Sequence, residues 1–198
     1  SIYIFSENFF YNQLVASSYI SSQILLPYGL GLKGGIRYEQ TKSSGEWNNN
    51  NNNPFENNYS NILPSAVISK SFSPMRSIKF SYNKRIRRPS VKQINTNENK
   101  QDNRNLTIGN PNLKPTITEQ YELAINSFGR ILQGSCQLYY KHSSNVIESF
   151  LDTIINEVSI SRYKNIGESK QFGTNLFGSI NLKKISLRVS FDIYNYSG

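Results

Sequence analysis

Few residues of this sequence have a type and spacing that could carry out a reaction. The chain contains one histidine, His142, and one cysteine, Cys136, so it offers neither a histidine pair nor a multi-cysteine metal site. Its carboxylates are scattered, without a pair spaced as general acid and base. No phosphate-binding glycine loop, zinc-protease motif or serine-hydrolase motif occurs. The sequence therefore predicts no enzyme, no cofactor and no bound metal.

Basic side chains are concentrated between positions 79 and 92, where no acid occurs: Lys79, Lys84, Arg85, Arg87, Arg88 and Lys92. In a chain of net charge +9, such a cluster raises nucleic acid or an anionic membrane surface as partners. No recognisable nucleic-acid-binding fold accompanies it, so we expect no nucleic-acid partner. Arg85 and Arg87 are instead candidate ligand contacts. The alternative is that they pair with acids of neighbouring strands or with lipid phosphates.

The elements that must position these side chains are β-strands. Apolar and polar residues alternate in segment after segment, as in 77–83, whereas helical spacing is nearly absent. We predict strands at 12–25, 29–42, 61–72, 76–88, 117–128, 131–151, 157–181 and 185–196. The sixth and seventh are long enough to project beyond a bilayer about 30 Å thick. Gly167 is a predicted bulge or kink in the seventh.

The connections between these strands alternate between short and long. Short ones are predicted around Pro27 and at 71–77, 127–131 and 182–186. Long polar ones are predicted at 43–60, at 89–117 and, shorter, near 152–156. All long loops then lie at one end of the sheet and all short turns at the other.

The long loops supply the other candidate ligand contacts, because loops vary with function. Trp47 lies beside six consecutive asparagines, Asn48 to Asn53, in the first long loop. Asn110 and Asn112 lie in the second. The alternative is that these loops are solvated, mobile and without a partner.

Each predicted strand has one apolar face and one strongly polar face. The polar face carries Lys33, Arg37, Glu39, Lys79, Gln133, Gln137, Lys141 and Arg188. A soluble sandwich or a single solvated sheet can also alternate in this way. Up-and-down order, long strands and a polar face too charged for a packed core favour a transmembrane barrel, in which the apolar face meets lipid. Cys136 shares the apolar face.

Five segments also carry a family resemblance. They are GIRYEQTKSSG at 35–45, NYSNILPSAVISKSFSP at 58–74, SIKFSYNKRIRRPSVKQIN at 77–95, NLTIGNPNLKPTITEQYELAI at 105–125 and YKNIGESKQFGTNLFGSI at 163–180. Together they resemble the C-terminal barrel of TonB-dependent outer-membrane receptors, of the outer membrane protein β-barrel family. RIRRPS and NPNLKP are the most specific parts, and we expect NPNLKP to act as a structural clamp at the barrel mouth.

The resemblance implies an all-β, antiparallel up-and-down transmembrane β-barrel in the outer membrane of a Gram-negative bacterium, with short periplasmic turns and long extracellular loops. Such receptors have about 22 strands and an N-terminal plug. Residues 1–198 are expected to be a single segment of about eight strands from a larger barrel, with no plug domain.

The implied function is uptake of a small-molecule, glycan or peptide nutrient. The implied partners are outer-membrane lipid, this nutrient, and an inner-membrane energising complex that acts through a missing N-terminal region. The alternative is a non-transport β-sheet binding module or a surface adhesin.

Overall fold

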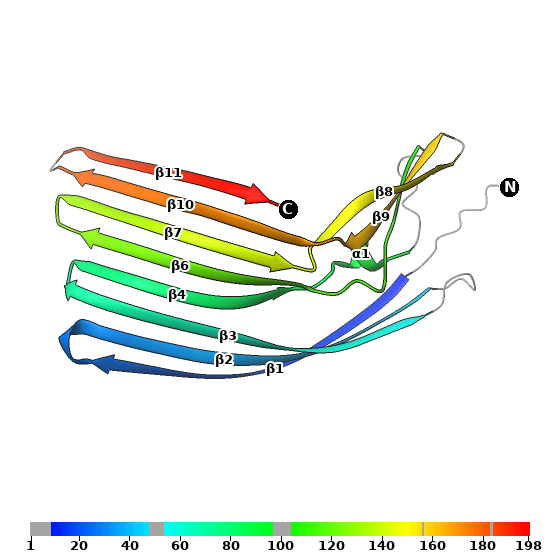
Figure 1. Ribbon diagram of the computed structural model, residues 1–198, viewed down its shortest axis with the longest axis horizontal. Helices are drawn as coiled ribbons and strands as arrows, with labels where there is room; N and C mark the ends of the chain where they lie inside the picture. Colours follow the sequence, from blue (N-terminus) through cyan, green and yellow to red (C-terminus); the bar gives the residue numbers. More distant parts are fainter. Residues whose placement is uncertain (1–8, 48–53, 97–103, 156, 183) are drawn as a thin grey trace.

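The computed structural model describes residues 9–47, 54–96, 104–155, 157–182 and 184–198. Eight strands form one antiparallel sheet (Figure 1). In spatial order they are β1 (Phe9–Leu26), β2 (Leu30–Trp47), β3 (Phe55–Ser73), β4 (Arg76–Arg87), β6 (Thr116–Phe128), β7 (Leu132–Ser144), β10 (Glu168–Asn181) and β11 (Ser186–Ser197). This confirms the all-β, up-and-down fold. The sheet is open, with β1 and β11 at its edges.

The connections confirm the predicted alternation of short and long. At one end of the sheet lie a 3-10 turn, η1 (Pro27–Gly29), and three short turns between the paired strands. At the other end lie a short helix, α1 (Val91–Ile94), and a three-stranded sheet of β5 (Asn105–Ile108), β8 (Ile147–Ile155) and β9 (Val158–Asn165). We call this end the mouth. None of the helices in the described ranges is long and apolar enough to cross a membrane.

The predicted sixth and seventh strands are wrong as continuous strands. Each breaks at the mouth, the sixth into β7 and β8 and the seventh into β9 and β10. The two breaks lie next to each other, because the Ile166 N–H donates to the Val146 carbonyl. Asn145 in one break and Gly167 in the other both adopt positive φ. The hairpin β8–β9 therefore leaves the main sheet as a unit. Gly167 is confirmed as a kink, and its φ of 142° favours glycine.

Two predicted long loops contain more regular structure than expected. Most of 43–60 is strand, because β2 continues to Trp47 and β3 begins at Phe55. The segment 89–117 contains α1 and β5, and β5 pairs in parallel with β9. The alternation pattern missed these strands because most of their side chains are polar and the aromatic ones, such as Trp47 and Phe55, lie on the inner face.

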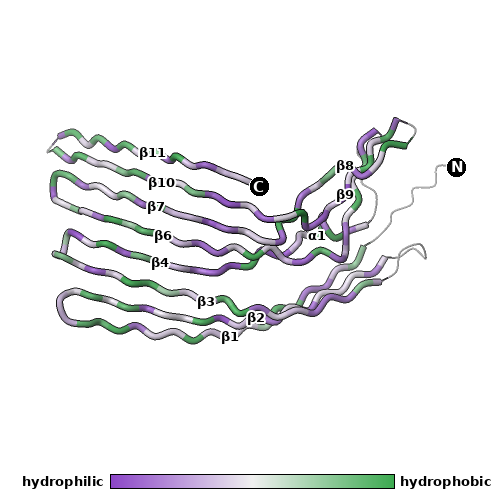
Figure 2. Tube along the Cα trace, in the orientation of Figure 1, coloured by the Kyte–Doolittle hydropathy of each residue, from purple (hydrophilic) through white to green (hydrophobic). Residues whose placement is uncertain are grey.

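One face of the main sheet, the outer face, carries apolar residues in rows that run across all eight strands. One such row, read from the strand register, is Ile24, Leu32, Ile68, Phe80, Leu123, Leu138, Thr174 and Ile193. Along each strand these residues alternate with polar ones (Figure 2). Phe80 is 44% exposed and Ile193 is 63% exposed. An apolar surface of this extent requires a partner other than water.

Toward the mouth the residue types on the outer face change from row to row, in the same order as the layers of a bilayer. The row after the apolar one contains Tyr82, Tyr121, Tyr140 and Phe172. The rings of Tyr82 and Tyr121 are 5.0 Å apart. The next row contains Lys84, Glu119, His142 and Lys170, and Lys84 Nζ lies 3.3 Å from Glu119 Oε1. A bilayer has the same order, because its hydrocarbon core is followed by an interface rich in aromatic side chains and then by charged headgroups.

The opposite, inner face carries charged and polar side chains from the short turns to the mouth. Its basic residues are Lys33, Arg37, Lys79, Arg85, Arg87, Lys141 and Arg188, and its acidic residues are Glu39, Glu122 and Asp192. No second sheet packs on the apolar face within the described part of the chain, which disagrees with a two-sheet sandwich. The inner face instead suits a hydrated lumen.

The two faces predict opposite surroundings for neighbouring residues of β4. In an otherwise cysteine-free variant of the protein reconstituted in bilayers, we expect a spin label at Phe80→Cys to be relaxed by oxygen, which concentrates in lipid. A label at Lys79→Cys is expected to be relaxed by a water-soluble nickel complex. The reverse pattern would contradict the assignment of the faces.

Candidate functional site

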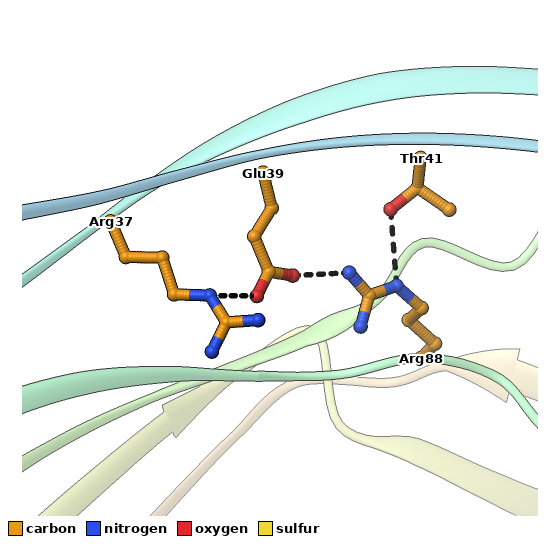
Figure 3. Close-up of polar contacts among 4 residues, drawn as sticks. All are labelled: Arg37, Glu39, Thr41 and Arg88. Atoms are coloured by element: carbon orange, nitrogen blue, oxygen red, sulfur yellow. Dashed lines mark hydrogen bonds and ion pairs between the residues drawn. The ribbon is translucent and has the colours of Figure 1, made fainter. Parts of the chain in front are cut away.

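A buried carboxylate organises the inner face at the mouth. The Glu39 side chain is 5% exposed and lies between two guanidinium groups (Figure 3). Arg37 Nε is 2.6 Å from Glu39 Oε1, and Arg88 Nη2 donates to Glu39 Oε2. Arg88 Nε also donates to Thr41 Oγ1 at 3.1 Å. Each carboxylate oxygen is thereby paired, which a buried charge requires.

Tyr59 of β3 adjoins this arrangement, opposite Thr41 in the strand register. Burial raises the pKa of the Tyr59 hydroxyl above its usual 10, and the Arg88 charge only partly opposes this. A tyrosine hydroxyl is protonated at neutral pH in any case, so Tyr59 is a neutral neighbour of Thr41 and Arg88, with both of which it is hydrogen-bonded.

The segment after β4 folds back onto the inner face because of its sequence, RIRRPS. Arg85 and Arg87 lie on β4, and Arg88 reaches across to β2. Ser90 caps α1 reciprocally with Gln93, since each side chain accepts from the other's backbone N–H. At the end of this segment Trp47 Nε1 donates to Asn95 Oδ1 at 3.1 Å. Arg88 and Asn95 thus fasten both ends of the segment to β2.

Aromatic rings surround Trp47 at the upper end of β1, β2 and β3. The ring centroid of Trp47 is 4.9 Å from that of Phe9 and 5.9 Å from that of Phe55. Gly45 makes this packing possible, because a Cβ at that position would lie 2.3 Å from Phe55 Cε1. Trp47 itself is 9% exposed.

The NPNLKP segment forms hydrogen bonds to three separate parts of the mouth. Its Asn110 N–H donates to the Gln93 carbonyl of α1, and its Pro111 carbonyl accepts from Asn57 Nδ2 of β3 at 2.9 Å. Lys114 and Asn165 of β9 bond reciprocally, at 2.8 and 2.9 Å. Between these bonds the chain turns at Pro111 and Asn112, where the ring of the proline fixes φ. This geometry is that of the expected structural clamp.

The five residues predicted to contact ligand are distributed over this region. Trp47 belongs to the aromatic cluster and Arg85 and Arg87 are exposed on the inner face of β4. Asn110 uses both polar side-chain atoms within the protein, since Nδ2 donates to the Tyr163 carbonyl and Oδ1 accepts from the Asn112 N–H. The Asn112 side chain is exposed. Ligand contact by these residues stays a prediction.

The asparagine run, Asn48 to Asn53, lies outside the described residues. Sequence reasoning placed Glu39 on the polar face but missed its pairing with Arg88. A signal for it existed, since Glu39 is an isolated acid on a face rich in bases. In the described part of the chain no three His, Cys, Asp or Glu side chains are grouped to hold a metal ion. The arrangement can bind polar groups through guanidinium, amide and aromatic side chains.

Comparison with known proteins gives a family match over nearly the whole chain. The family described as "Outer membrane protein beta-barrel family" matches residues 2–198. A search of curated proteins found no match.

Solved structures show the same fold. The FrpB iron transporter from Neisseria meningitidis has a TM-score of 0.67 at 17% identity, over 93% of this chain and 26% of that chain. The ferric yersiniabactin uptake receptor FyuA from Yersinia pestis has a TM-score of 0.68 at 14% identity, over 96% and 28%. The alcaligin receptor FauA from Bordetella pertussis has a TM-score of 0.64 at 16% identity, over 94% and 31%. The chain thus spans about a quarter to a third of these structures.

The Glu39 pairing predicts that the carboxylate holds the segment 88–96 on the inner face. Replacing it in Glu39→Gln removes two charge-assisted bonds while keeping the side-chain shape. We expect the free energy of local opening of this segment to fall by about 2 kcal/mol, measured as faster amide hydrogen exchange at 90–95. Glu122→Gln, on the same face of β6, is the matched control. Equal exchange in both variants would contradict the role of Glu39.

Proposed function

The chain belongs to the outer membrane protein beta-barrel family, and from that premise we propose that it forms part of the wall of a receptor that takes up a nutrient. Its location is the outer membrane of a Gram-negative bacterium. The observation that carries the proposal is the two-faced wall, apolar outside and polar inside, with elaborate structure at one end only. Such a wall separates lipid from a hydrated passage.

The chain is proposed to be one segment of a larger barrel. Two observations support this: the eight-stranded sheet is open, and the chain spans only part of each similar structure. Closing a barrel pairs the edges that an open sheet leaves free. We therefore propose that β1 and β11 pair with further strands of the complete receptor.

We propose the class of nutrient from the similar structures and from the side chains at the mouth. Those structures are an iron transporter, a ferric yersiniabactin uptake receptor and an alcaligin receptor. Import is therefore favoured over catalysis, with a small molecule, glycan or peptide as cargo and an inner-membrane complex as energy source. Arg85, Arg87 and Trp47 are proposed contacts, because guanidinium groups donate to ligand oxygens and Trp supplies a ring.

Deletion of the gene provides the direct test of uptake. We expect loss of growth on one nutrient supplied at a limiting concentration, among ferric chelates, copper, haem, oligosaccharides and peptides, with restoration by the intact gene. An uncoupler should abolish the restored uptake. Unchanged growth on all of these nutrients would contradict the proposal.

The exposed arginines predict a second result. Arg85→Ala combined with Arg87→Ala should lower the initial uptake rate about tenfold, the loss expected when a charge-assisted contact to ligand is removed. The charge-matched control is Lys33→Ala with Arg188→Ala, which lie on the same face toward the short turns. Equal rates in the two double variants would exclude ligand contact by Arg85 and Arg87.

A further inference from the structure

A pocket of about 400 Å³ lies between β3 and the NPNLKP segment. It has a structural cause, since β3 and β4 pair only up to Ser65 and Asn83. Pro64, the next residue of β3, has no N–H to continue the ladder. Beyond this point the two strands diverge (Figure 1), and the NPNLKP segment fills only part of the gap.

The lining of this pocket is rich in amides. Five asparagines from three parts of the chain meet there: Asn57, Asn58 and Asn61 of β3, Asn112 of the NPNLKP segment and Asn145 of the β7–β8 break. Tyr59 adds an aromatic ring and Lys114 a single positive charge. The described lining residues include no carboxylate, so the pocket offers a cation no charged ligand.

One donor in this lining is buried without a partner. Asn61 Nδ2 is shielded from solvent and has no hydrogen-bond acceptor among the described residues. An unpaired buried donor is destabilising, so an acceptor that the amide could reach by rotating about χ2 would relieve it. The side chain of Asn112, which bonds to its neighbour only through its backbone N–H, is exposed on the opposite wall.

We propose that this pocket binds a sugar residue of the receptor's ligand. An amide group has two donor hydrogens and an acceptor oxygen, and a sugar hydroxyl can also donate and accept a hydrogen bond. Several amides around one small volume therefore match a ring that bears several hydroxyls. The Tyr59 ring offers an apolar face to the C–H groups of the sugar. The volume lies within the range of about 300–1,000 Å³ usual for small-molecule sites.

Other ligand classes match the lining less well. A multiply charged anion would meet only one formal charge, that of Lys114. A peptide is usually held by strand pairing together with pockets for alternate side chains, whereas this lining is a single compact volume with amides on opposing walls. The inference rests on the proposed function, since it names the nutrient class that the receptor recognises.

Binding can be measured without transport, on the full-length receptor in lipid nanodiscs free of sugar-based detergent. The probes are glucose, N-acetylglucosamine, cellobiose and chitobiose, with neutral trialanine as the peptide probe. Saturation-transfer NMR and calorimetry should detect saturable binding of at least one sugar. Asn61→Ala and Asn112→Ala should each weaken it at least tenfold. Asn126→Ala, on the inner face of β6 far from the pocket, should not change it.

No saturable binding of any of the four sugars, binding that both pocket variants leave unchanged, or saturable binding of trialanine alone would overturn the inference. Asn112→Ser keeps the loop backbone bond and tests the site if Asn61→Ala fails to fold. Uptake without sugar binding would overturn only this inference. Sugar binding without any growth phenotype would contradict only the proposed transport.

Discussion

The strand lengths, the strand pairing and the polar inner face of this structure all depend on its apolar outer face. Its side chains have nothing to pack against within the described chain, yet they form continuous rows over eight strands. Hydrocarbon removes that surface from water, and hydrocarbon in turn requires every backbone N–H and C=O to be paired by neighbouring strands. Long, regular, antiparallel strands follow from that requirement, and so does a polar face on the other side.

Beyond the aromatic row the requirement disappears, and the structure changes accordingly. The pairing of β3 with β4 ends before Pro64, the β8–β9 hairpin bends away at Asn145 and Gly167, and α1 folds onto the inner face. Specific side-chain bonds add to the strand ladder there. Arg88 and Glu39 hold one loop to β2, and the NPNLKP segment joins β3, α1 and β9. The mouth is therefore both the most elaborate part of the chain and the one available for ligand recognition.

The membrane-facing part of the fold was predictable from sequence because lipid imposes a period of two on it. Ile78, Phe80 and Tyr82 alternate with polar residues, which identifies both their strand and its outer face. Cys136 lies on the outer face as expected. Strand ends at the mouth were not predictable, since most side chains of 43–47 and 55–60 are polar and the aromatic ones, Trp47, Phe55 and Tyr59, lie on the inner face. RIRRPS and NPNLKP were recognised as motifs. Their partners, Glu39, Asn57 and Asn165, are distant in sequence, so only the fold identifies them.

In the complete barrel, the outer rows are expected to face lipid, while Glu39 and Arg88 are expected to lie inside a closed wall. A cryo-electron-microscopy map of the complete protein in lipid nanodiscs tests this claim directly. We predict that Leu32, Phe80 and Leu138 lie within the lipid belt, that Arg88 contacts Glu39 in the lumen, and that β1 and β11 are each paired with another strand. Protein packed against the Phe80 row, or a lumen lined by that row, would contradict the account.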